Sequence, residues 1–254
     1  MTRLFSSILL LTLAAGCHAQ GLRGGADRGI AEVDIIDRDR GTSLTPHLYR
    51  GEYWVAGKPG ARYAIEIRNR LGERLLAVTS VDGVNAISGA TAGWDQVGYV
   101  LNAGQRYQIT GWRKSDAQVA AFTFADCADS YAARTGRPTN VGIVGIALFR
   151  ERQPEPLAIQ VPGLRERAMQ SAPPARDSAA SKLGTAHGDR EYSYVAQTEF
   201  ARLQAEPNQI VRIHYDTFEH LLAMGIIKPP HPQPGSADPF PATPGSGYVP
   251  DPPA

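Results

Sequence analysis

The chain has 254 residues, 43% of them hydrophobic, which is long enough for one or two domains with a proper core. Its 26 basic and 25 acidic residues balance and form no basic cluster, which argues against nucleic-acid binders, because their surfaces carry a basic excess. Function therefore has to be sought in individual segments.

The first nineteen residues have the pattern of a secretory signal peptide. Arg3 precedes an apolar run at residues 4–15, and small residues follow at 14–19. The run is shorter than the roughly 20 apolar residues of a transmembrane helix, and no later run reaches that length. We therefore expect residues 1–19 to direct export to the periplasm.

Two processing routes are open for this signal. Cleavage after Ala19 fits a signal peptidase, whereas LAAGC at 13–17 is similar to a lipoprotein signal, with Ala14 where Leu is usual. The short signal favours lipidation at Cys17, so we expect contact with the outer membrane through a lipid anchor only. Either route removes or modifies Cys17, which leaves Cys127 without a disulfide partner in the chain.

Residues 30–152 show the pattern of an antiparallel β-sandwich, with a small barrel as the alternative. Apolar residues alternate at 62–69, and Asp82-Gly83 between two apolar runs is a hairpin signal. The almost continuous apolar run at 141–149 indicates a strand buried on both faces. One short helix is expected at 131–135, capped by Asp129 or Ser130.

The rest of the chain divides by its proline content. Residues 153–190 are expected to form a linker and residues 191–228 a small β-β-α unit, with strands at 194–203 and 209–215 and a helix from 216 onward. Such a unit is too small to be stable alone, so it should dock on the sandwich. Residues 229–254 hold ten of the 19 prolines, which predicts a disordered tail of extended character.

No pattern of catalytic or metal-binding residues emerges. His187 and Asp189 could pair with Ser88 or Ser130, but the Gly-x-Ser-x-Gly motif is absent. The spacing of His214, His220 and His231 matches no zinc site. We therefore assign no catalytic residue, metal or cofactor.

The three tryptophans, Trp54, Trp94 and Trp112, lie in or near expected turns and strand ends. Trp112 and Arg113 stand in an expected strand–strand turn, where an aromatic beside an arginine commonly anchors a partner. These two residues are our candidate partner-binding pair. The alternative is that each indole fills an end of the core.

Three strings resemble a group of exported proteins of Gram-negative bacteria that carry no known activity. They are SVDGVN at 80–85, GWRKS at 111–115 and YAARTGR at 131–137, and segment 184–227 is similar to the C-terminal part of that group. The resemblance covers most of residues 50–228 and implies export, but no substrate or site. We expect a non-catalytic envelope module that binds a protein or small ligand; the alternative is a periplasmic hydrolase without a recognisable motif.

Overall fold

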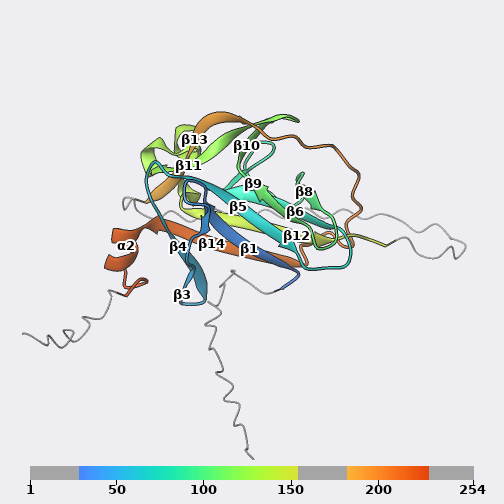
Figure 1. The fold of residues 1–254 in the computed structure, drawn as a ribbon, viewed down its shortest axis with the longest axis horizontal. Coiled ribbons are helices and arrows are strands. Elements are labelled where there is room, and N and C mark those ends of the chain that lie inside the picture. The colour runs from blue at the N-terminus through green and yellow to red at the C-terminus, as the bar shows by residue number, and fades with distance from the viewer. Residues whose placement is uncertain (1–28, 154–181, 229–254) are drawn as a thin grey trace, which may run out of the picture.

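A computed structural model describes residues 29–153 and 182–228 (Figure 1). The expected signal peptide with Cys17, residues 154–181 of the expected linker, and the proline-rich tail at 229–254 lie outside the described residues.

The described residues form two seven-stranded sheets that stack face to face. In sheet A the strand order is β10-β11-β5-β1-β2, with β13 added to β11 and β9 added to β5. In sheet B the order is β3-β4-β14-β12-β6-β7, with β8 added to β6. Neither sheet closes on itself within this part of the chain, so the expected mostly-β sandwich is confirmed over the alternative. The strands of sheet A are β1 (Ala31–Asp37), β2 (Thr42–Ser43), β5 (Arg62–Asn69), β9 (Arg106–Ile109), β10 (Gly111–Ser115), β11 (Gln118–Asp126) and β13 (Leu183–Tyr192); those of sheet B are β3 (His47–Tyr49), β4 (Glu52–Gly57), β6 (Leu75–Val81), β7 (Val84–Asn85), β8 (Tyr99–Leu101), β12 (Ile143–Arg150) and β14 (Gln209–Thr217).

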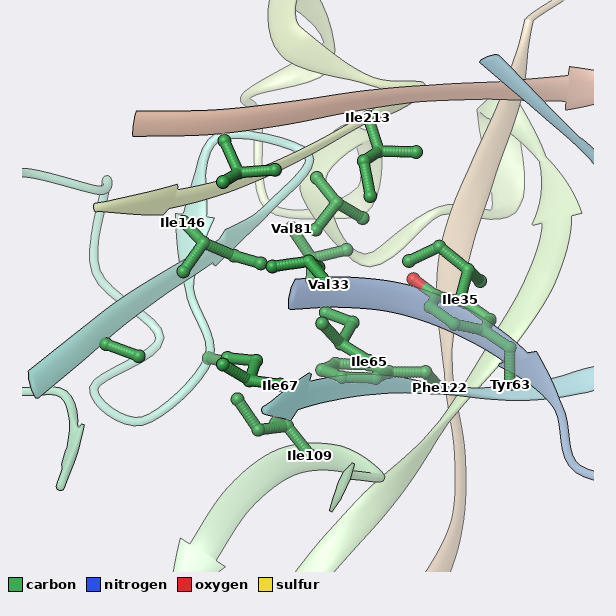
Figure 2. Close-up of a cluster of buried hydrophobic side chains, with 14 of the residues drawn as sticks. Val33, Ile35, Tyr63, Ile65, Ile67, Val81, Ile109, Phe122, Ile146 and Ile213 are labelled. Atoms are coloured by element: carbon green, nitrogen blue, oxygen red, sulfur yellow. The ribbon is translucent and has the colours of Figure 1, made fainter. Parts of the chain in front are cut away.

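The core lies between the two sheets, where every second residue of a strand points inward. Figure 2 shows Val33, Ile35 and Ile65 from sheet A facing Ile146 and Ile213 from sheet B. All five are at most 2% exposed. This packing of side chains from both sheets is the main source of stability, because an apolar side chain of this size contributes about 1.5–3 kcal/mol when buried.

The C-terminal strand–helix unit is part of sheet B. β14 runs between β12, to which it is antiparallel, and β4, to which it is parallel. α2 (Phe218–Ala223) follows directly, and its first turn is capped by Thr217, whose hydroxyl accepts a hydrogen bond from the His220 amide at 3.2 Å. The expected strand at 194–203 is not formed; this segment instead crosses the outer face of sheet B in irregular conformation.

Residues 183–190, expected to belong to a linker, form most of β13, which pairs with β11. Two glycines permit this pairing. A Cβ on Gly184 would lie 2.5 Å from Ser130 Cβ, and one on Gly188 would lie 2.8 Å from the Ala121 carbonyl oxygen. The strand packs too closely for side chains at these positions, so its sequence lacks the apolar alternation that marks other strands.

Short helices connect the ends of the strands: η1 (Cys127–Asp129), α1 (Tyr131–Arg134) and η2 (Pro138–Asn140). The cap of α1 is Ser130, one of the two expected residues; its Oγ accepts a hydrogen bond from the Ala133 amide at 3.1 Å. Cys127 is a free, half-buried thiol. The longest described helix, α2, has six residues, and none of the described helices qualifies as a membrane span.

Candidate functional site

Trp112, half of the expected partner-binding pair, lies in β10 and not in a turn. Its side chain is 3% exposed and packs edge-on against Phe122, with ring centroids 5.2 Å apart. It also packs against the Tyr131 ring, with ring centroids 5.0 Å apart. The expectation of a surface-exposed Trp112 is therefore wrong, and the alternative of an indole that fills the core holds for this residue.

Arg113, the other half of the pair, is engaged within the fold. Its guanidinium lies 5.7 Å from the centre of the Tyr99 ring and donates a hydrogen bond to the Ser193 carbonyl oxygen. The side chain thereby fastens the segment that leaves β13 to the end of sheet A. Its hydrogen-bonding capacity is largely used inside the molecule.

The histidine–serine pairing considered from the sequence is not assembled among the described residues. The Ser130 hydroxyl donates to the Cys127 carbonyl at 2.8 Å, and Ser88 Oγ accepts a hydrogen bond from the Ala90 amide at 3.3 Å. His187 stands in β13 with its ring 6.0 Å from that of Tyr131. No hydrogen bond joins His187 to Asp189 or to either serine in this part of the chain.

His214 and His220 likewise have separate structural partners. His214 stacks on Trp54 at 4.5 Å, and burial lowers the pKa of its imidazole. His220 Nδ1 lies 2.5 Å from Asp216 Oδ2 at the start of α2. Within residues 29–153 and 182–228 no three His, Cys, Asp or Glu side chains are placed to share a metal ion, and His231 lies outside these ranges.

An apolar groove of about 240 Å³ opens on the outer face of sheet B. Its floor is formed by Val78 of β6, Ala147 of β12 and Ile210 of β14, which are neighbours across the sheet. Trp94 forms one side of the groove and Arg212 also lines it. Trp94 is 52% exposed, an unusual state for an indole next to an apolar surface.

The loop that carries Trp94 is held in place by its own hydrogen bonds. The Gly93 amide donates to Gln96 Oε1 at 3.1 Å, and Gln96 Nε2 donates to the Thr91 carbonyl at 2.9 Å. Arg202 donates to the carbonyls of Trp94 and Gln96 at 2.8 and 2.7 Å. The indole is therefore presented beside the groove by a fixed backbone, which lowers the entropy lost when a ligand binds.

A buried polar network joins the two sheets near Asp82. Its carboxylate accepts hydrogen bonds from the amides of Gly142 and Thr185, at 2.9 and 2.8 Å, and from the Tyr215 hydroxyl. The Thr185 hydroxyl also bonds to those of Tyr63 and Tyr215, at 2.7 and 2.6 Å. Burial raises the pKa of the Asp82 carboxyl to about 6. Asp82 is 1% exposed, so we assign the network to the architecture and not to a site.

Comparison of the chain with family models, with curated proteins and with solved structures found no match. The Trp94 groove is therefore described from its geometry alone. Trp94 is one of three tryptophans that the sequence places near expected turns. What separates it from Trp112 is the exposed fraction of the side chain, which the sequence does not show.

Proposed function

We propose that this chain is an exported, lipid-anchored module of the cell envelope that binds an extended, proline-containing segment of a partner protein in the Trp94 groove. The observation that carries the proposal is a half-exposed indole held rigidly beside an apolar groove. Export and the lipid anchor rest on the first nineteen residues and on Cys17.

The size of the groove favours a peptide segment over a whole organic ligand. Sites for drug-sized ligands enclose about 300–1,000 Å³, and this groove has about 240 Å³. That volume accommodates a few side chains of an extended chain that passes over the sheet. Gly145 lines the groove, and a Cβ at that position would have its nearest atom, Ser80 Cβ, 3.8 Å away. A side chain there would therefore extend into the groove, and the glycine leaves this space open.

Its chemistry favours proline. Polyproline II segments dock in grooves with exposed aromatic rings, because their backbone is already extended and loses little entropy on binding. Trp94 supplies the ring, and Val78, Ala147 and Ile210 supply the apolar floor. Arg212 adds a positive charge, so a segment with an acidic residue beside its prolines is the best match.

The test is a titration of the chain without residues 1–19 with a synthetic decaproline peptide that has an aspartate at each end. The indole NH signal of Trp94, followed by ¹H–¹⁵N NMR, should shift progressively to saturation. Because the groove takes up only a few side chains of the peptide, the contact is small, so weak binding in fast exchange is expected. Trp94→Ala should weaken binding, followed on the remaining groove signals, by about tenfold or more.

Tyr192→Ala is the matched control, since Tyr192 is 81% exposed and lies outside the groove. Its binding curve should equal that of the unsubstituted chain. A decaalanine peptide with the same ends should bind more weakly. Unchanged groove signals at millimolar decaproline, or equal affinity of the Trp94→Ala variant, would show that the groove does not bind such segments.

A further inference from the structure

A second pocket, of about 340 Å³, lies where η1 and α1 meet strands β10 and β13 of sheet A. Lys114 comes from β10 and His187 from β13. Asp129 comes from η1, whereas Tyr131 and Arg134 are the first and last residues of α1. Three segments distant in sequence therefore bring polar side chains together at one end of sheet A.

A series of tilted and edge-on aromatic rings supports this pocket. Phe122 packs on Trp112 at 5.2 Å, Trp112 on Tyr131 at 5.0 Å, and Tyr131 lies 6.0 Å from His187. Phe122 and Trp112 are at most 3% exposed, so the series is anchored in the core. Tyr131 and His187 are thereby fixed in position before any ligand arrives.

The short helix that carries Tyr131 and Arg134 is also fixed. Ser130 caps its start, and the Thr135 hydroxyl at its end donates to the Tyr131 carbonyl at 2.8 Å. Arg137, just beyond, donates to the Gly89 carbonyl at 3.1 Å. The pocket is therefore preorganised, which is what a binding site requires.

Most polar groups of the pocket are unused by the fold. Among the described residues Lys114, Asp129 and Arg134 make no ion pair or hydrogen bond through their side chains, although Arg38, Arg62, Arg68, Arg74, Arg106 and Arg150 all have carboxylate partners. The Tyr131 hydroxyl also has no hydrogen bond in this part of the chain, whereas the His187 ring is hydrogen-bonded to backbone groups of His187 and Gly188. Four side chains without polar partners in the described ranges, those of Lys114, Asp129, Tyr131 and Arg134, thus line one open pocket.

The charge of the pocket selects the ligand. Lys114 and Arg134 are cationic and Asp129 is anionic. Burial, together with the charge of Lys114, lowers the pKa of the His187 imidazole, so this ring is neutral at pH 7. The net charge of the pocket is therefore +1. Its guanidinium, that of Arg134, can bond to two oxygens of a carboxylate or phosphate at once.

We propose that this pocket binds a small ligand with a carboxylate or phosphate group. Arg134 and Lys114 hold the anionic group, and the Tyr131 hydroxyl donates a further hydrogen bond to it. Asp129 accepts a hydrogen bond from a hydroxyl or amino group elsewhere on the ligand. This site is separate from the Trp94 groove and shares no residue with it.

The experiment titrates the chain without residues 1–19 with inorganic phosphate and, separately, with succinate, at constant ionic strength. The ring signals of Tyr131 and His187, followed by NMR, should shift to saturation with at least one anion. The anion with the lower dissociation constant assigns the class. Arg134→Gln and Lys114→Gln should each weaken that binding about tenfold, because a charged hydrogen bond is lost.

Arg152→Gln is the matched control, because Arg152 is exposed and does not line the pocket. It removes the same charge and should leave the dissociation constant unchanged. Arg134 and Lys114 are exposed, so their variants should fold normally, which their NMR spectra would show. Shifts that do not saturate below about 10 mM with either anion, or that persist equally in the Arg134→Gln and Lys114→Gln double variant, overturn the proposal.

Discussion

The outer faces of the two sheets differ in the side chains they carry. On sheet A the face is charged: Glu32 lies 3.8 Å from Arg68 across β1 and β5, and Glu66 lies 3.4 Å from Arg106 across β5 and β9. A polar cavity of about 580 Å³ lies over this face. Each of these charges has a partner on a neighbouring strand, so the face is stable in water without a cover.

On sheet B the outer face is apolar and needs covers. The segment after β13 places Phe200 on one end of it, and the Arg202 guanidinium lies 4.2 Å from the centre of the Phe149 ring. At the other end α2 and the residues after it partly bury Trp54, which packs against Leu221, Ile226 and Ile227. The Trp94 groove lies where neither cover reaches. On a sheet that is apolar on both faces, the part of the outer face between the two covers thus stays open as a groove.

The largest expected effect tests whether the covered face of sheet B is a true core. Phe149 is fully buried on that face, so Phe149→Ala should lower the free energy of unfolding by about 3–5 kcal/mol. Urea unfolding followed by circular dichroism measures it. A loss below 1 kcal/mol would mean that the cover is loose and that the two outer faces differ less than the structure shows.

The second effect tests the cover at α2. Leu221 is 0% exposed and Leu222 is 37% exposed, so Leu221→Ala should cost about 2–4 kcal/mol and Leu222→Ala less than about 1. The two variants remove the same atoms from adjacent positions and are each other's control. Equal losses on thermal unfolding would contradict the described orientation of the helix.

A third effect compares a buried carboxyl with the solvated ones of sheet A. The pKa of Asp82 is about 6 in the folded chain, above its ordinary value of about 3.9. A raised folded pKa means that folding favours the protonated form, so the contribution of Asp82 to stability is largest below about pH 4 and is lost as the pH rises through about 6. Relative to Asp82→Asn, the unfolding free energy should drop by up to about 3 kcal/mol between pH 4 and pH 7.

That drop is measured by urea unfolding of both chains at each pH, and the other carboxyls cancel in the difference. A difference between the two chains that does not change with pH would show that Asp82 has an ordinary pKa.

The smallest effect is expected on the outer face of sheet A. Glu66 pairs with Arg106 and accepts a hydrogen bond from Gln108 at 2.9 Å. Because surface ion pairs are screened by water, Glu66→Gln should lower stability by less than about 1 kcal/mol, and 1 M salt should reduce the difference further. A salt-independent loss of 2 kcal/mol or more would indicate that this face is covered in solution.

Local signals in the sequence were sufficient for several elements. The alternation at 62–69 coincides with β5, and the run at 141–149 predicts β12, which is buried on both faces. Asp82 and Gly83 have positive φ angles of 53° and 74°, as the hairpin signal requires. These features depend on side-chain period and on turn conformation, which are properties of neighbouring residues.

Other elements depend on contacts between distant segments, which local patterns do not contain. Residues 153–190 have the composition of a linker, but residues 183–190 belong to β13, whose glycines lie against Ser130 and Ala121, far away in the chain. Segment 194–203 was expected to be a strand, yet it is irregular; Phe200 packs on the outer face of sheet B, while Tyr194 and Leu203 are exposed. In the first case a strand forms without an apolar alternation, and in the second an expected strand does not form.

The sequence by itself determined a β-rich fold, its main hairpins and helix caps, and the absence of familiar catalytic motifs. Only the tertiary structure decided which tryptophan is exposed, since the sequence places both Trp112 and Trp94 in or near expected turns or strand ends, but they are 3% and 52% exposed. It also decided that Lys114, Arg134 and His187 meet in one pocket. The physical reason is that burial and convergence depend on how two sheets and their covers pack, and residues more than 70 positions apart in the sequence contribute to each site.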